Sequence, residues 1–132
     1  MLSLVAAAAL EAQFVSFDKL VEESDIILLS CPLNKETTNL FNANVFKKMK
    51  STSVLINVSR GRESQYSVTI INVHSSIFNI LKSCIIFSEC IDQDALVEAL
   101  KNREIWGAGL DVMVPEPLPV DHPLLSLENC GK

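Results

Sequence analysis

Three aliphatic runs of strand length constrain the fold of this chain more than any other feature. They cover residues 25–30, 53–58 and 106–112. Continuous apolar runs of this length are typical of strands that are covered on both faces, as in parallel sheets. Consecutive parallel strands need crossover connections, and helical patterns lie between the runs. The sequence therefore predicts an α/β fold in which these three strands are parallel and adjacent.

Four segments with helical character accompany these runs. They are residues 17–23, 37–41, 44–49 and 92–100. Asn42 or Asn44 can cap the segment at 44–49, and Asp92 can cap the last one, where Leu96 and Leu100 share one face. Four prolines between positions 115 and 123 predict an extended loop after the third strand.

Charged residues lie at or just after the ends of two of the predicted strands. Arg60 follows the second strand, Asp111 closes the third, and Glu116 lies in the loop just beyond. In open α/β sheets the ligand crevice lies outside the carboxyl ends of the strands, which share one edge. We therefore expect these three side chains to converge on a site for an anionic substrate and a polar cofactor.

Several motifs of the chain resemble a known family. They are Ser24–Leu33, Val54–Gly61 and Gly107–Asp111, which resemble the cofactor domain of the D-2-hydroxyacid dehydrogenases. Pro115–Pro119 and Asp121–Leu125 are most similar to the glyoxylate/hydroxypyruvate reductase branch of that family. The resemblance covers residues 12–61 and 91–130. It implies that residues 1–132 form a partial NAD(P)-binding domain, the second half of a doubly wound, Rossmann-like parallel sheet.

The same resemblance assigns roles to the charged residues. A 2-oxo acid offers a carboxylate beside a carbonyl, and the guanidinium of Arg60 can hold both and stabilise the developing oxyanion. The family counterpart of Asp111 holds the nicotinamide carboxamide, and that of Glu116 orients the catalytic histidine. In the family this histidine lies beyond Lys132, and neither His122 nor His74 is expected to replace it.

Four further residues are cofactor contacts by resemblance only. Cys31 and Pro32 end the first strand where the family lines the adenine-ribose side of the pocket. Val58 and Ser59 lie against the nicotinamide in the same scheme. A purely structural role for these residues explains their presence nearly as well.

The function implied is NAD(P)H-dependent reduction of glyoxylate or hydroxypyruvate to the 2-hydroxy acid. A cytoplasmic location and a homodimer are implied for the intact family member. Two alternatives stay open: a non-catalytic, NAD-sensing corepressor on the same fold, and a non-functional product of splicing or of an incorrect gene structure. The Pro115–Pro119 run favours the reductase branch over the corepressor.

Residues 62–90 interrupt the family pattern. The segment is rich in Ser, Ile, Val and Asn, has no clear period, and is long for a connection inside a domain. We interpret it as translated non-coding sequence, with a lineage-specific loop as the alternative, and expect it to be the least ordered part of the chain. Its strand-prone stretches, residues 68–73 and 85–87, have no evident partner. Because the resemblance covers only half of the sheet, we expect an apolar strand edge to be left bare.

Composition excludes several other functions. The net charge of −5 gives no electrostatic reason to expect nucleic acid or an anionic membrane as a partner, and no apolar stretch is long and uninterrupted enough to span a bilayer. The four cysteines show no Cys-x-x-Cys spacing, so no metal site is expected. None of the four glycines forms a Gly-x-Gly-x-x-Gly turn. The chain alone is therefore expected to be inactive and poorly soluble.

Overall fold

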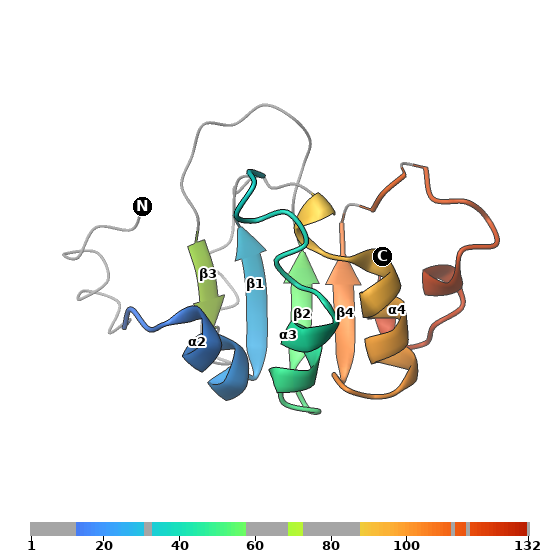
Figure 1. Cartoon of the computed structure of the whole chain (residues 1–132). Coiled ribbons are helices and arrows are strands. Elements are labelled where there is room, and N and C mark those ends of the chain that lie inside the picture. Colours follow the sequence, from blue (N-terminus) through green and yellow to red (C-terminus); the bar gives the residue numbers. More distant parts are fainter. Residues whose placement is uncertain are drawn as a thin grey trace.

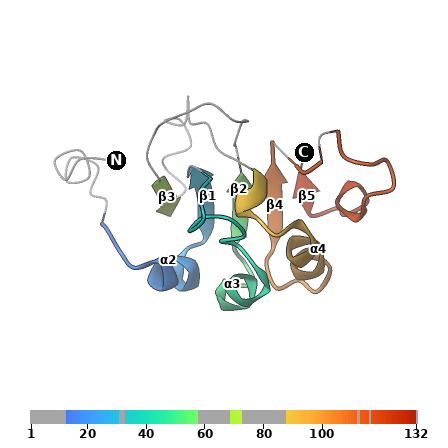
Figure 2. The same cartoon turned by 45° about the horizontal axis from the view of Figure 1, so that its top comes forward.

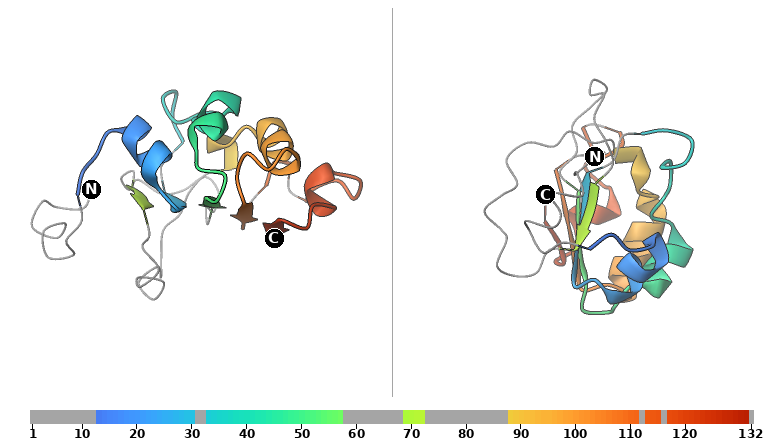
Figure 3. Two further views of the ribbon diagram at one scale, coloured as in Figure 1. Left: turned by 90° about the horizontal axis from the view of Figure 1, so that it is seen from below. Right: turned by 90° about the vertical axis from the view of Figure 1, so that its left-hand side faces the viewer.

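A five-stranded sheet organises the chain in the computed structural model, and three helices pack on one of its faces (Figures 1 and 3). The structure describes residues 13–30, 33–57, 69–72, 88–111, 113–115 and 117–131. No helix in these ranges is long and apolar enough to cross a membrane.

The sheet has the strand order β3-β1-β2-β4-β5 (Figure 2). Its strands are β1 (Ile26–Ser30), β2 (Val54–Asn57), β3 (Thr69–Asn72), β4 (Gly107–Leu110) and β5 (Cys130–Gly131). The helices are α2 (Phe17–Glu23), α3 (Ala43–Lys48) and α4 (Gln93–Lys101), with short 3-10 helices η1 (Ser88–Cys90) and η2 (Pro123–Leu125). Strands β1, β2 and β4 are parallel neighbours, which confirms the sequence prediction, and β5 adds a fourth parallel strand.

The central strands are buried because their side chains are apolar on both faces. Ile27, Leu29 and Leu55 are fully buried in the main core cluster, beneath the helices. Leu28 points to the opposite face, since successive strand residues alternate, and it is only 2% exposed. This double burial explains why β1 is a continuous aliphatic run without polar alternation.

Each helix covers the sheet with the apolar side that its sequence provides. In α4, Leu96 and Leu100 are buried on one face, as their spacing predicts. Helix α3 buries Phe46 and α2 buries Val21. Lys48 Nζ of α3 donates a hydrogen bond of 2.7 Å to Asp18 Oδ1 of α2. This bond raises the pKa of the lysine.

Side-chain caps fix where the helices begin. Asn42 is the cap of α3, because its side-chain oxygen accepts from the amides of Asn44 at 3.0 Å and Val45 at 3.3 Å. The Asp92 carboxylate accepts from the Ala95 amide at 3.1 Å and caps α4, as predicted. These bonds satisfy amides that the first turn of a helix leaves without a backbone partner.

The predicted helical turn at 37–41 is wrong in position. The turn spans residues 35–39, where Asn34 Oδ1 accepts from the Thr37 amide at 3.0 Å. Phe41 instead forms a parallel β-bridge with Ile91. The Phe41 amide donates to Cys90 O at 3.0 Å, and the Asp92 amide donates to Phe41 O at 3.0 Å. This pairing holds the backbone of Asp92, the cap residue of α4, against Phe41.

One expectation for the inserted segment is also wrong. Thr69–Asn72 within the stretch 68–73 does have a partner, because it forms β3 and pairs antiparallel with β1. Strand β3 therefore covers the edge of β1 that faces away from β2. The other parts of residues 62–87, including the stretch 85–87, lie outside the described residues, so the expectation of low order is untested there.

The loop after β4 is less extended than its prolines predict. Pro123 begins η2, since its fixed φ angle suits the first position of a helix.

Gly107 and Gly109 lie inside β4, which confirms that they form no phosphate-binding turn. A Cβ at Gly107 would lie 3.0 Å from Asn129 O, so this glycine allows the chain that leads into β5 to approach closely.

Truncation of a core leucine tests this packing. Leu55→Ala is expected to lower the free energy of unfolding by about 2–5 kcal/mol, because the side chain is fully buried. Leu125→Ala is the matched control at a 37% exposed site, with an expected loss of about 0.5 kcal/mol or less. Urea unfolding followed by circular dichroism measures both, and equal losses would contradict the assignment of the core.

Candidate site at the carboxyl edge of the sheet

The carboxyl ends of the parallel strands meet at one edge of the sheet, and Asp111 lies there. It follows β4 directly and its side chain is exposed. Its backbone amide donates to Asn57 O, the last residue of β2, at 2.9 Å. The ends of β2 and β4 are thus joined by a hydrogen bond at the place where the sequence predicts a ligand site.

The other six predicted site residues lie outside the described part of the chain. Val58, Ser59 and Arg60 continue directly from Asn57, which is fully buried and pairs with Leu110 in the sheet. Cys31 and Pro32 follow Ser30 at the end of β1. Glu116 comes two residues after Val114. The convergence of Arg60, Asp111 and Glu116 therefore stays a prediction.

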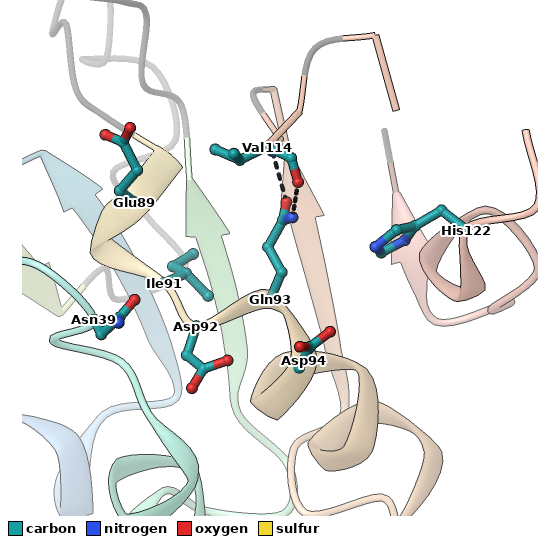
Figure 4. A pocket seen from close by; sticks show the side chains of 8 residues that line it. All are labelled: Asn39, Glu89, Ile91, Asp92, Gln93, Asp94, Val114 and His122. Atoms are coloured by element: carbon teal, nitrogen blue, oxygen red, sulfur yellow. Dashed lines mark hydrogen bonds between the residues drawn. The ribbon is translucent and has the colours of Figure 1, made fainter. Parts of the chain in front are cut away.

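A cleft of about 370 Å³ opens beside this edge, at the start of α4 (Figure 4). Its lining residues come from the 35–39 turn, η1, the first turn of α4 and the loops after β4. They are Asn39, Glu89, Ile91, Asp92, Gln93, Asp94, Val114 and His122. The pairing of Asn39 with Glu89, an amide-to-carbonyl bond of 2.8 Å, holds the turn and η1 together on one side.

The cleft is acidic. Glu89, Asp92 and Asp94 contribute three carboxylates, and the described lining contains no lysine or arginine. The Asp92 carboxylate is engaged in capping α4. The described lining therefore offers no lysine or arginine that could pair with a phosphate group.

Gln93 connects the first turn of α4 to the loop after β4. Its Oε1 accepts from the Val114 amide at 2.9 Å, and its Nε2 donates to the Val114 carbonyl oxygen (Figure 4). The side chain of Gln93 thereby binds both the backbone N–H and the backbone carbonyl of Val114. Sequence reasoning gave Gln93 no role, because nothing local indicates a contact with a residue 21 positions away.

His122 is a capping residue. Its Nδ1 accepts from the Leu124 amide at 3.2 Å at the start of η2, and its ring points toward the cleft (Figure 4). This bond occupies one ring nitrogen and leaves the other for further contacts. That His122 does not replace the family's acid–base histidine stays a prediction. His74 lies outside the described residues.

The chain belongs to the NAD-binding domain family of the D-isomer-specific 2-hydroxyacid dehydrogenases. The family model matches residues 3–66 and 88–131, which leaves residues 67–87 between the two matched ranges. The cofactor of this domain is NAD(P).

Among curated proteins the chain is similar to reductases of 2-oxo acids. It is 40% identical over 124 residues to the human glyoxylate reductase/hydroxypyruvate reductase, which covers 94% of this chain and 30% of the relative. It is 38% identical over 120 residues to the glyoxylate reductase of Korarchaeum cryptofilum, covering 91% and 28%. The chain thus spans less than a third of the length of these relatives.

Solved structures show the same fold. The NAD-dependent formate dehydrogenase from Staphylococcus aureus in complex with NAD is 34% identical, with a TM-score of 0.65 over 90% of this chain and 28% of that one. The D-lactate dehydrogenase with NAD+ from Lactobacillus jensenii is 29% identical, with a TM-score of 0.65 over 91% of this chain and 32% of that one. These neighbours establish the chain as a Rossmann-like α/β domain.

The link between Gln93 and Val114 can be tested without a ligand. Gln93→Glu keeps the accepting oxygen but removes the donor to the Val114 carbonyl oxygen. We expect the free energy of local opening at Val114 to fall by about 1–2 kcal/mol, measured by amide hydrogen exchange. Asp94→Asn is the control, because it makes the reverse exchange, a carboxylate for an amide, at the next residue of the same helical turn. Unchanged exchange at Val114 in Gln93→Glu would contradict the link.

Proposed function

We propose that this chain supplies the nicotinamide and substrate side of an NAD(P)H-dependent reductase that acts on glyoxylate or hydroxypyruvate. The observation that carries the proposal is the 2.9 Å bond from the Asp111 amide to Asn57 O. It joins the strand end that bears Asp111 to the strand end that leads to Arg60. Membership of the dehydrogenase family and 40% identity to a glyoxylate reductase/hydroxypyruvate reductase support the choice of substrate.

The residues at this edge suit one end of the cofactor better than the other. The exposed carboxylate of Asp111 can accept hydrogen bonds from a nicotinamide carboxamide, which offers two N–H donors. The acidic cleft and the lack of a Gly-x-Gly-x-x-Gly turn in the sequence give no cradle for the pyrophosphate. The nicotinamide end therefore fits these residues. When bound, the reduced cofactor supplies a hydride for the substrate carbonyl.

Arg60 binds the substrate in this proposal. Its planar guanidinium pairs with the carboxylate of the 2-oxo acid through two parallel hydrogen bonds. The same charge stabilises the negative charge that develops on the carbonyl oxygen as the carbonyl is reduced. Asp111 orients the nicotinamide, so the two residues would bring the reacting groups together across the ends of β2 and β4.

Glu116 acts on the proton donor and not on the substrate. It accepts a hydrogen bond from a histidine, orients the ring and raises the pKa of the imidazole so that it can protonate the product oxygen. The link between Gln93 and Val114 holds the loop two residues before Glu116. The histidine belongs to the part of a full-length reductase that these 132 residues do not cover, so the chain alone is proposed to be inactive.

The resemblance to the family assigns the remaining contacts with the cofactor. Cys31 and Pro32 would contact the adenine-ribose side of the cofactor, and Val58 and Ser59 the nicotinamide. A cytoplasmic location and a homodimer are proposed for the full-length enzyme, by analogy with the family. Turnover of a 2-oxo acid separates this enzyme from a corepressor that only senses NAD.

The test uses a hybrid enzyme. In the human relative, the matched segment, 30% of that protein, is replaced by this chain without residues 67–87. Arg60→Ala in this hybrid is expected to lower kcat/KM for hydroxypyruvate by about 10²–10³. The Kd of NADH should change little, because Arg60 is proposed to contact the substrate alone.

Two controls accompany this measurement. Lys101→Ala removes a cation at the far end of α4 and should leave turnover unchanged. The unmodified 132-residue chain should show no oxidation of NADH or NADPH with either substrate. Normal turnover by the Arg60→Ala hybrid, or turnover by the 132-residue chain, would refute the assignment.

A further inference from the structure

The loop that follows β4 is attached to the rest of the fold at three points. Met113 and Leu118 are partly buried and pack against the main core cluster. Between them, the side chain of Gln93 binds both backbone groups of Val114 (Figure 4). Within the described part of the chain, Gln93 is the one residue that hydrogen-bonds to residues 113–115. The polar attachment of this loop therefore depends on a single side chain.

Gln93 starts from a backbone position that several hydrogen bonds fix. The preceding residue, Asp92, donates its amide to Phe41 O at 3.0 Å, and its carboxylate accepts from the Ala95 amide at 3.1 Å. Phe41 is fully buried, so this pairing ties the start of α4 to the core. Because the backbone of Gln93 is already ordered, binding to Val114 costs only the rotamer freedom of one side chain.

The sequence makes the connection from Val114 to Glu116 stiff. A single residue, Pro115, lies between them, and Pro117 follows Glu116. The ring of a proline locks its φ angle, and a residue before a proline is restricted to extended conformations. Val114 and Glu116 both precede a proline, so few backbone torsions between them are free to change. A displacement of Val114 is therefore passed on to Glu116.

We propose that Gln93 is a positioning residue, which holds Glu116 where its carboxylate can bind the proton-donating histidine of the full-length enzyme. The inference rests on the role proposed above for Glu116. Gln93 itself contacts neither substrate nor cofactor and acts through the backbone of Val114. When this attachment is lost, the carboxylate moves relative to the imidazole, so proton transfer becomes slower while binding of the substrate is preserved.

The pH dependence of the reaction separates this role from a purely structural one. A carboxylate beside an imidazole favours the protonated ring and raises the pKa of the histidine. Reduction of the carbonyl needs the protonated ring, so kcat falls as the pH rises through this pKa. Displacement of Glu116 lowers the pKa toward its ordinary value, and the alkaline limb of the profile then moves to lower pH.

The test uses the hybrid enzyme with Gln93→Met, which keeps the length of the side chain and removes both bonds to Val114. We expect kcat for hydroxypyruvate to fall about tenfold, KM to change less than about twofold, and the alkaline limb to move down by about 0.5–1 pH unit. Titration of the histidine by nuclear magnetic resonance in the cofactor-free hybrid should show the same shift of its pKa.

The substitution changes no charge, because the amide of Gln93 does not titrate. The titratable groups of the neighbouring cleft stay as they are in Gln93→Met; they are Glu89, Asp92, Asp94 and His122. Gln93→Glu keeps the oxygen that accepts from the Val114 amide, so its effect on kcat should be smaller than that of Gln93→Met. Unchanged kcat and an unchanged profile in Gln93→Met would overturn the inference.

Lys101→Met is the matched control at the other end of α4. It removes the 3.0 Å bond from Lys101 Nζ to Glu98 Oε1, again by replacing a polar end group with methionine. This variant should keep the kcat and the alkaline limb of the unmodified hybrid. An equal shift of the limb in Lys101→Met and Gln93→Met would show a general effect of weakening α4 and would overturn the positioning role.

Glu116→Gln distinguishes failure of this inference from failure of the proposed function. It should move the alkaline limb further than Gln93→Met does, and adding Gln93→Met to it should cause no further shift. A shift in Glu116→Gln without one in Gln93→Met would overturn the positioning role alone. No shift in either variant would overturn the proposed role of Glu116 as well. Additive shifts would show that Gln93 does not act through Glu116 and would also overturn the inference.

Discussion

The parallel ladder of β1, β2 and β4 is the interaction on which the rest of the structure depends. It sets Ile27 against Leu55 and Leu55 against Ala108, so the aliphatic runs form one continuous apolar layer beneath the helices. Because the strands run in one direction, their carboxyl ends share an edge. Every residue with a proposed chemical role lies on a segment that leaves this edge, so the ladder decides whether a site can form at all.

The carboxyl edge of the sheet and the cleft beside it suit different chemical groups. The ends of β2 and β4 bring an acceptor at Asp111 beside the segment that leads to Arg60, which suits a carboxamide and an anionic substrate. The described lining of the neighbouring cleft carries three carboxylates and no lysine or arginine. This agrees with the proposal that these residues serve the nicotinamide end of the cofactor and not its pyrophosphate.

Local patterns in the sequence were sufficient to predict strands β1, β2 and β4 and helices α2, α3 and α4. The aliphatic runs gave β1, β2 and β4, and the spacing of Leu96 and Leu100 gave the buried face of α4. Contacts between distant segments were not predictable. The bridge from Phe41 to Ile91, the bonds from Gln93 to Val114 and the pairing of β3 with β1 join residues 21 to 50 positions apart in the chain. Each depends on where the sheet places these segments, which no local pattern encodes.

The most direct test of the account is a crystal structure of the hybrid enzyme with NAD and oxalate, a non-reacting mimic of a 2-oxo acid. The account predicts that the Arg60 guanidinium forms paired hydrogen bonds with oxalate and that the Asp111 carboxylate accepts from the nicotinamide carboxamide. Both contacts should lie at the carboxyl ends of β2 and β4. Oxalate bound elsewhere, or Arg60 directed away from Asp111 and the nicotinamide, would contradict the account.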